Sequence, residues 1–511
     1  MYTNEPIIRL IWFMNIIKST GTFSFYTLIS RISGYFRDIL IAIFLGSGPI
    51  ADAFFVAFRI PNTFRRIFGE GSFNAAFVPS YAKELTKSKK NSENFANKVF
   101  SLLTFSLLGL VILVELFMPL FVSLIAPGFK SDPEKFILAT DLTRITFPFI
   151  LFISLASFFS AILNSHNKFA AASAAPIILN LVLIAILLYA KYLDDYLVIY
   201  MSYGVSVAGL IQMIFLILTL KKTYKPQFKI NLNIDNKTKS FFKKLLPSIF
   251  SSGVTQINIL IGTIIASFQA GAVSYLYYAD RIYQINLAIA GIAIGTVILP
   301  KLSSYIAQKK LKDIDLIQNK SLELSLFLSL PAMAGLLIAS EEIVSSLFGY
   351  GSFNKEGVEN SAKALFYFAL GLPAFSLIKI LSNFVFARDN TKIPFYFSLI
   401  SVIINASISI YYFRDFGFII IPIATSISSW INALLLYYYL NHKKFFKVSL
   451  SLIFQFFKIS FSVLLMALFL FSSINFFSVQ LEYDSNFKVV YLLLLVITSA
   501  IIYFSISLLT K

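Results

Sequence analysis

Segments of about twenty mostly apolar residues recur along the whole chain, and they restrict its fold more than any other feature. Leu102–Val114 and Leu492–Ile502, for example, contain no charged residue. A helix needs about 20 apolar residues to cross the hydrocarbon core of a bilayer, because each residue adds about 1.5 Å. Only 13% of the 511 residues are charged, against about 25% in soluble domains. We therefore predict an all-α polytopic membrane protein.

Windows of this length predict about fourteen transmembrane helices. The first window follows the basic residues Arg9 and Lys18 and contains arginines itself, so no cleavable signal sequence is expected. The fourteen windows lie near residues 20–45, 50–79, 98–125, 138–164, 172–193, 197–220, 243–268, 272–300, 317–340, 361–387, 393–413, 417–440, 452–476 and 487–509.

Charge divides the connections between these windows into two alternating sets. The connection 221–244 contains eight lysines and 301–320 contains five, whereas 46–49, 126–133 and 482–486 are poor in basic residues. Basic residues concentrate in the cytoplasmic loops of membrane proteins, so both termini are predicted to be cytoplasmic. The net charge of +18 is then explained by loops that face membrane lipids, and no nucleic-acid partner is expected.

Several residues recur at an offset of roughly 220 positions, which indicates an internal repeat. Pro148 and Asn180 in the first half correspond to Pro373 and Asn405 in the second. The offset covers six helices, and an even number of spans preserves orientation, so the two halves are expected to be parallel repeats. We predict two six-helix lobes around a central cationic cavity, followed by two appended helices.

The predicted parts of the chain follow from this repeat. They are an N-terminal cytoplasmic segment, an N-lobe, a basic cytoplasmic linker, a C-lobe and the appended helix pair. These parts cover residues 1–19, 20–221, 222–242, 243–441 and 449–511.

Charged residues inside the predicted helices are the first candidates for function. Each one at the bilayer centre costs at least about 2.5 to 3.5 kcal/mol, so such residues normally face a water-filled cavity or a partner. Arg37 in the first helix, Arg59 in the second and Arg281 in the eighth each lie roughly 12 to 14 Å from the outer end of their helix, at about 1.5 Å per residue. We expect these arginines to lie at one level, with Arg37 meeting Arg281 across the lobe interface.

Positive charge exceeds negative charge in this set, and that excess suggests a ligand. A buried ion-pair network that joins helices is the alternative explanation. A cavity with surplus arginine favours a multivalent anion, because the guanidinium group binds phosphate oxygens in a bidentate fork and keeps its charge. The arginines are Arg31, Arg37, Arg59, Arg65, Arg66 and Arg281, against the acidic residues Asp38, Asp52, Glu70 and Asp280.

Several long motifs resemble those of the MurJ/MviN lipid II flippases. They are R-I-S-G-Y-F-R-D at 31–38, A-D-A-F-F-V-A-F-R-I-P-N at 51–62, R-R-I-F-G-E-G-S-F-N-A-A-F-V-P at 65–79, Y-Y-A-D-R at 277–281, F-G-Y-G-S-F-N at 348–354 and A-R-D-N-T-K-I-P at 387–394. The resemblance implies the fold of the multidrug/oligosaccharidyl-lipid/polysaccharide exporter superfamily. It also implies that lipid II, the undecaprenyl-pyrophosphate-linked disaccharide peptide, is moved across the bacterial inner membrane for cell-wall synthesis.

The resemblance and the charge pattern together give the candidate site residues. The predicted substrate-binding residues are Arg31, Arg37, Asp38, Arg65 and Arg281. The predicted secondary cavity or gate residues are Ser30, Asp52, Arg59, Arg66, Glu70, Asp280 and Lys379. The resemblance further implies that the last two helices form a groove for the polyprenyl tail, and that cell-wall synthesis proteins are potential partners of a monomeric flippase.

Other functions remain as alternatives at this point. A flippase for another oligosaccharide-linked polyprenyl lipid is the nearest, and a cation-coupled drug exporter is a more distant one. A membrane enzyme acting on lipid phosphates would need a general base or a metal site, yet the chain has no cysteine and only two histidines. No cofactor is therefore expected. The energy source stays open, because the membrane potential could drive transport, or the amide oxygens of Asn258 and Asn405 could bind a coupling ion.

Overall fold

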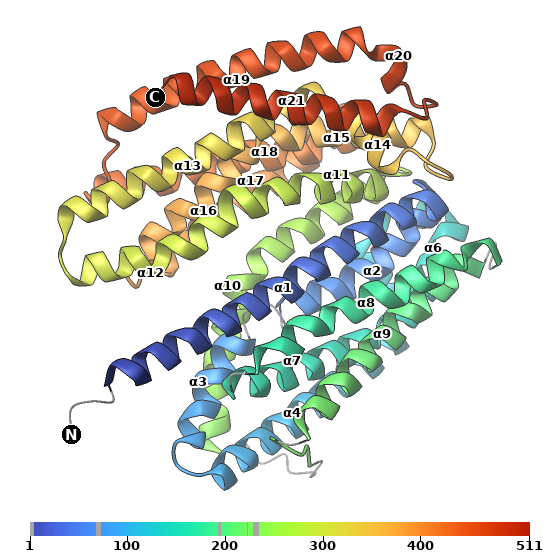
Figure 1. Ribbon diagram of the computed structural model, residues 1–511. Coiled ribbons are helices and arrows are strands. Elements are labelled where there is room, and N and C mark those ends of the chain that lie inside the picture. The colour runs from blue at the N-terminus through green and yellow to red at the C-terminus, as the bar shows by residue number, and fades with distance from the viewer. Residues whose placement is uncertain are drawn as a thin grey trace. The chain divides into compact units, whose positions relative to one another are not determined.

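The computed structural model describes residues 5–67, 73–166, 168–192, 196–221, 223–227 and 235–510, and over these ranges the regular structure is helical (Figure 1). The chain divides into two compact units, Met1–Phe44 with Pro49–Gln256 and Leu45–Gly48 with Ile257–Lys511. The first unit is built from α1 (Glu5–Leu45), α2 (Pro49–Ile67), α3 (Phe73–Leu85), α4 (Lys89–Leu116), α5 (Met118–Ile125), α6 (Pro133–Thr146), α7 (Phe149–Ser165), α8 (Phe169–Leu188), α9 (Leu197–Leu220) and the first part of α10 (Asn236–Ala266).

The second unit begins within α10 and contains both the remaining repeat and the appended helices. Its further helices are α11 (Ala272–Leu287), α12 (Ile294–Ala307), α13 (Leu311–Ile338), α14 (Ser340–Phe348), α15 (Lys355–Leu370), α16 (Leu372–Phe386), α17 (Lys392–Phe416), α18 (Ile420–His442), α19 (Leu450–Phe476), α20 (Ser478–Leu481) and α21 (Lys488–Leu509).

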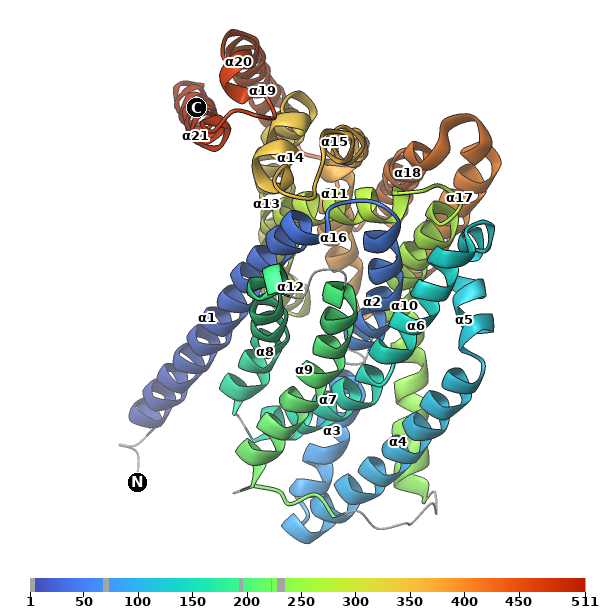
Figure 2. The same cartoon turned by 90° about the vertical axis from the view of Figure 1, so that its right-hand side faces the viewer.

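Over the described residues, the predicted windows fall mostly on helices, with short breaks inside some of them. Within the described ranges, nine helical segments are long and apolar enough to cross a membrane, or ten if the bent pair Lys355–Leu370 and Leu372–Phe386 is one span. The nine include Lys392–His442 as a single segment. Hydrogen bonds from Ser401 to the Ser428 carbonyl and from Asn405 to Thr425 show that α17 and α18 run antiparallel, so this segment is a hairpin of two helices (Figure 2).

Proline explains where two of the predicted spans are broken. Pro148 is the residue before α7, which separates this helix from α6, and Pro373 lies in the first turn of α16, just after α15 ends. Proline has no backbone N–H and fits the first turn of a helix, so each proline favours a new helix start. The matching positions of these breaks support the internal repeat.

A pair of asparagines makes the same interhelical contact in each unit. Asn180 on α8 donates from Nδ2 to Ser33 Oγ on α1 at 3.0 Å, and Asn405 on α17 donates from Nδ2 to Asn258 Oδ1 on α10 at 2.7 Å. Both contacts join residues that are 147 positions apart. The two halves therefore share one helix arrangement, offset by 225 positions (405 − 180 and 258 − 33).

The division between the two compact units falls within α10, and part of the predicted linker at 222–242 lies outside the described residues. The ring of Phe241, near the start of α10, packs edge-on against Phe73 at 5.8 Å and against Phe77 at 6.0 Å, both in the first unit. This aromatic contact holds the first turns of α10 on the first unit, so the division falls after Gln256.

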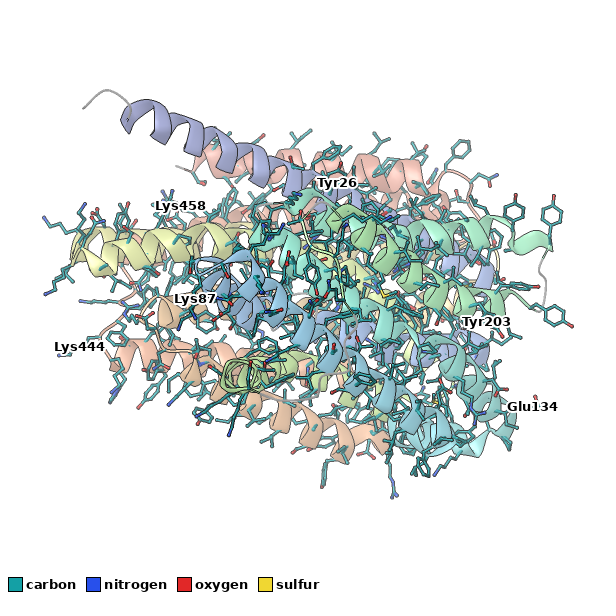
Figure 3. The ribbon with its side chains drawn as sticks, turned by 90° about the horizontal axis from the view of Figure 1, so that it is seen from below. Tyr26, Lys87, Glu134, Tyr203, Lys444 and Lys458 are labelled. Atoms are coloured by element: carbon teal, nitrogen blue, oxygen red, sulfur yellow. The ribbon has the colours of Figure 1, made fainter. Side chains whose placement is uncertain are left out.

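The two ends of the first unit carry connections of different character. In Figure 3, Lys87 lies toward one end of these helices, whereas Glu134 and Tyr203 lie toward the other. Connections on opposite ends are expected for helices that cross a membrane, and the basic end corresponds to the predicted cytoplasmic side.

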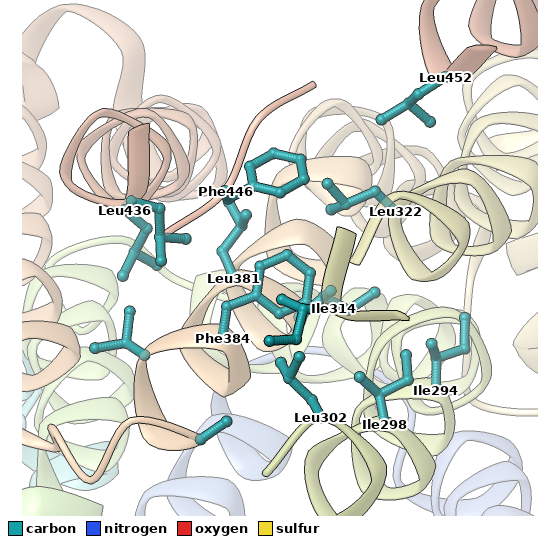
Figure 4. Close-up of a cluster of buried hydrophobic side chains, with 14 residues drawn as sticks. Ile294, Ile298, Leu302, Ile314, Leu322, Leu381, Phe384, Leu436, Phe446 and Leu452 are labelled. Carbon is teal, nitrogen blue, oxygen red and sulfur yellow. The ribbon is translucent and has the colours of Figure 1, made fainter. Parts of the chain in front are cut away.

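The core of the second unit joins α12, α13, α16 and α18. Leu302, Ile380, Phe384 and Leu436 have fully buried side chains there, packed in the cluster shown in Figure 4. Within a membrane, such helix packing depends on close van der Waals contact, because lipid is as apolar as the core. The appended helices α19 and α21 lie against α13, where Tyr503 on α21 donates to the Phe327 carbonyl at 2.7 Å.

The short connection between α1 and α2 belongs to the second unit. Tyr278 donates to the Gly46 carbonyl at 2.9 Å, and the Gly48 amide donates to Ser274 Oγ at 3.3 Å. Gly46 has φ of +68°, and a Cβ atom there would lie 2.2 Å from the Ser352 carbonyl oxygen. Only glycine fits this position, because a side chain would be both strained and blocked.

Candidate functional site

Arg37 on α1 is the centre of a buried polar network in the first unit. Its side chain donates from Nε and Nη2 to Asp38 Oδ1 at 3.0 and 2.6 Å, and from Nη1 to Asn180 Oδ1 on α8 at 2.9 Å. Arg37 is 5% exposed and Asp38 2% exposed. The guanidinium also lies over the ring of Phe58 on α2, 5.7 Å from its centroid. The arginine is therefore both fixed in direction and balanced by a neighbouring carboxylate.

Asn180 is a site residue that sequence analysis used only as a landmark of the repeat. Besides binding Arg37, its Nδ2 donates to the Ser30 carbonyl at 2.9 Å and to Ser33 Oγ at 3.0 Å. A Cβ atom on Gly34 would lie 3.4 Å from Asn180 Nδ2, so glycine lets α8 approach α1 here. The recurrence of the same residue at position 405 was the only signal in the sequence that pointed to it.

Two predicted residues of α1 lie outside the guanidinium contacts of Arg37. Ser30 contributes its backbone carbonyl to Asn180, rather than a side chain to Arg37. Arg31 is exposed, one position from the exposed apolar residue Ile32. The structure thus joins Arg37 and Asp38, but it places Arg31 apart from that pair.

The predicted basic group of α2 lies at half-buried positions. Arg65 donates from Nε to Asn62 Oδ1 at 3.1 Å, one turn earlier in the same helix. Arg59 and Arg66 are also half-buried. Glu70 lies outside the described residues, so its predicted role stays a prediction.

Asp52, predicted as a secondary cavity or gate residue, lies in a buried ion pair. Its carboxylate is fully buried and pairs with Lys135 Nζ on α6 at 2.6 Å, and Lys135 is 6% exposed. The ammonium also lies 4.1 Å from the centroid of the Phe129 ring. In this structure the pair joins α2 to α6, because both charges are closed off from solvent.

Arg281 on α11 is the predicted substrate-binding arginine of the second unit. Its Nη2 donates to the Tyr277 hydroxyl at 2.8 Å, and its guanidinium carbon lies 4.6 Å from the centroid of the same ring. The neighbouring Asp280 accepts a hydrogen bond from Gln284 Nε2. Arg281 is half-buried, so its side chain keeps some contact with solvent.

Lys379 on α16 has an exposed side chain at mid-helix. It lies beside the π-helical segment Ala288–Ala293, where a Cβ atom on Gly291 would come within 3.5 Å of Lys379 Cγ. Asn383, one turn further along α16, donates to the Gly295 carbonyl at 2.9 Å. The two glycines allow α16 to approach this irregular segment closely.

The side-chain amides of Asn258 and Asn405, which could bind a coupling ion, form hydrogen bonds within the protein. Asn405 Nδ2 donates to Asn258 Oδ1, and Ser409 donates to Asn405 Oδ1 at 3.2 Å. Over the described ranges, no group of three or more His, Asp or Glu side chains could hold a metal ion.

At the basic end of the first unit, α4 holds the start and the end of the connection to α10. Asn97 accepts a hydrogen bond from Tyr224, and Lys98 Nζ donates to Asp235 Oδ2 at 2.7 Å. Burial would raise the pKa of Asp235, but hydrogen bonds from Lys98 and Thr238 lower it to about 2. These contacts fix both ends of the basic connection to α4.

Each unit therefore contains an arginine within a helix whose direction is set by neighbouring side chains. Arg37 is held by an acidic group and an amide, and Arg281 is held by a phenol. Guanidinium groups that are oriented in this way suit the binding of a multivalent anion. The meeting of Arg37 with Arg281 stays a prediction.

Comparison with known proteins extends over nearly the whole chain. A family model described as "Lipid II flippase MurJ" matches residues 41–495. A protein of Rhizobium meliloti (strain 1021), described as "Probable lipid II flippase MurJ", is 42% identical over 435 residues, which cover 83% of this chain and 80% of that protein. A protein of Rickettsia prowazekii (strain Madrid E) with the same description is 39% identical over 430 residues, or 83% of this chain and 84% of that protein.

Solved structures give a consistent comparison. A structure described as "Lipid II flippase MurJ, inward closed conformation" is 29% identical, covers 95% of this chain and 97% of its own, and has a TM-score of 0.81. An inward-facing multidrug resistance MATE family transporter of the MOP superfamily has a TM-score of 0.65 at 12% identity, covering 81% of this chain and 94% of its own. The second likeness concerns the fold alone.

Proposed function

The chain belongs to the lipid II flippase MurJ family, and we propose that it moves lipid II from the cytoplasmic to the periplasmic leaflet by alternating access. The observation that carries this proposal is the match to a MurJ structure over 95% of the chain with a TM-score of 0.81. The internal repeat supports the mechanism, since repeats of this kind rock against each other around a fixed site.

The pyrophosphate of lipid II is the part that the arginines would recognise. In the absence of substrate, Asp38 supplies the negative charge for Arg37, which lowers the free energy needed to keep this arginine buried. An incoming pyrophosphate would compete with Asp38 for the guanidinium of Arg37 and would also engage the guanidinium of Arg281. Arg31 and Arg65 would contact the remainder of the head group, with Arg59, Arg66, Glu70 and Lys379 as further contacts or gates.

The appended helices fit the groove proposed for the polyprenyl tail. Several large apolar side chains of α19 and α21 are exposed, which is the surface that a lipid chain requires. These side chains include Leu464, Leu468, Phe471, Leu493, Ile497 and Ile501.

The remaining properties follow from this function. The protein would act as a transporter without chemical change of its substrate and without a cofactor, as a monomer in the bacterial inner membrane. Both termini would be cytoplasmic, and cell-wall synthesis proteins would supply and consume the lipid.

Transport by the purified full-length chain in proteoliposomes tests the proposal. Lipid II should become accessible in the opposite leaflet faster than in protein-free vesicles, and lipid-linked O-antigen should not. Equal rates for both lipids would replace lipid II with a general polyprenyl-oligosaccharide substrate, and no acceleration of either would overturn the flippase function. The same vesicles with imposed sodium, proton and electrical gradients would identify the energy source.

A further inference from the structure

We propose that Tyr277 is a positioning residue for substrate binding, which holds the guanidinium of Arg281 in the direction that an incoming pyrophosphate requires. This inference rests on the proposed function and adds a residue that does not itself bind the substrate. Tyr277 would act through Arg281.

Two separate contacts define the direction of the guanidinium group. The hydroxyl of Tyr277 accepts a hydrogen bond from Nη2 of Arg281 at 2.8 Å, and the same ring lies 4.6 Å from the guanidinium carbon. The residues are four positions apart on α11, where side chains occupy the same face of a helix. The hydrogen bond restricts rotation of the Arg281 guanidinium, and the ring restricts the distance of this group from the helix.

The ring of Tyr277 is itself held in place. Tyr277 is 5% exposed, and its ring packs edge-on against Tyr278 at 5.7 Å. Tyr278 is fully buried between Phe348 and Phe353, at 5.0 and 4.9 Å. Tyr277 therefore has little freedom to rotate, and the orientation that it gives to Arg281 is set by the core of the second unit.

The chemistry of the phenol suits this role. A phenol accepts a hydrogen bond without adding a negative charge, so the contact with Tyr277 orients Arg281 and does not itself neutralise the guanidinium. The orienting group of Arg37 is a carboxylate, since Asp38 lies 2.6 Å from that guanidinium. The geometry of Tyr277 thus fits an anion site in which Arg281 is oriented before the substrate arrives.

Two substitutions separate the contributions of Tyr277. Tyr277→Phe keeps the ring and removes the hydroxyl, and it should raise the Kd of the purified full-length protein for lipid II about tenfold, as expected for a lost hydrogen bond to a charged group. Tyr277→Leu removes both contacts and should raise the Kd further. Tyr275→Phe is the matched control on the same helix, because it removes a hydroxyl that donates to Glu356 Oε1 at 3.4 Å.

A double-substitution cycle distinguishes positioning from a structural role. In an Arg281→Gln background, Tyr277→Phe should leave the Kd for lipid II unchanged, because the guanidinium that it orients is absent. Thermal unfolding of Tyr277→Phe should match that of Tyr275→Phe. An equal loss of affinity with and without Arg281 would overturn the inference, as would a Tyr277→Phe protein with wild-type affinity.

The same experiment separates this inference from the proposed function. If Arg281→Gln binds lipid II as well as the wild type, the proposed binding role of Arg281 fails. If Arg281→Gln weakens binding and Tyr277→Phe does not, the role of Arg281 stands and the role of Tyr277 is refuted.

Discussion

Replacing Asp52 by asparagine should destabilise the first unit strongly, because it removes one partner of a buried ion pair. Asp52 is fully buried, and the Lys135 ammonium lies 2.6 Å from its carboxylate with a side chain that is 5% exposed. Breaking such a pair leaves an uncompensated charge in the interior and costs about 3 to 5 kcal/mol. The Phe129 ring, 4.1 Å from the ammonium, offsets part of this loss, so we expect a value near the lower end.

The free energy of unfolding of the purified full-length protein is measured in detergent by reversible denaturation. Asp52→Asn should lower it by about 3 kcal/mol. The double variant Asp52→Asn/Lys135→Met should recover most of this loss, because it removes the unpaired ammonium and keeps the volume of the side chain. A loss below about 1 kcal/mol for the single variant would refute the burial argument.

Transport by the same variants decides between a structural role and the predicted gate role of Asp52. If the pair only joins α2 to α6, the Asp52→Asn/Lys135→Met protein should translocate lipid II at the wild-type rate per folded molecule. Loss of transport in this stable double variant would place Asp52 on the substrate path, as the sequence suggested.

Three further predictions follow from buried polar contacts. Asn180→Ala should weaken lipid II binding about tenfold in equilibrium binding, because Arg37 would lose its contact at 2.9 Å. Lys488→Met should loosen the start of α21 from the rest of the second unit, because it removes hydrogen bonds to two backbone carbonyls at 2.9 and 2.7 Å. Hydrogen exchange of the α21 backbone amides should then accelerate. Burial, together with nearby lysines, lowers the pKa of His166 from its usual 6.5. Its contribution to stability is therefore complete above pH 6.5 and is lost as pH falls below that value, and thermal unfolding of His166→Gln should show less acid sensitivity than that of the wild type.

Each of these predictions has a result that contradicts it. Asn180→Ala with wild-type affinity would remove the positioning role of Asn180. An unchanged rate of hydrogen exchange in α21 of the Lys488→Met protein would show that apolar packing alone holds this helix. Equal acid sensitivity of His166→Gln and the wild type would assign the pH effect to other groups.

The helices were predictable from sequence because the bilayer imposes their length, and the breaks at Pro148 and Pro373 were predictable because proline lacks a backbone donor. Contacts between distant segments were not. The 143 positions between Arg37 and Asn180 give no local pattern, so the buried amide appeared only as a repeated residue. The docking of Phe241 on the first unit was hidden for the same reason, since a phenylalanine near a basic segment has no distinctive signal.

Charge alone also could not assign roles within the candidate set. Arg37, Arg281 and Asp52 all appeared as intramembrane charges, yet Asp52 is closed off in an ion pair and Arg281 is held by a phenol. The spacing of Tyr277 and Arg281, four positions apart in one helix, was available in the sequence and could have indicated their contact.

Lipid II translocation by Arg37→Ala and Arg281→Ala proteins in proteoliposomes tests the central claim most directly. Arg414→Ala is the matched control, because Arg414 is an exposed arginine in the last turn of α17. We predict that each of the first two variants lowers the translocation rate at least about tenfold, as expected for a lost charge-assisted contact to pyrophosphate, and that the control retains the wild-type rate. Wild-type translocation by both Arg37→Ala and Arg281→Ala would contradict the account of an arginine site for the pyrophosphate.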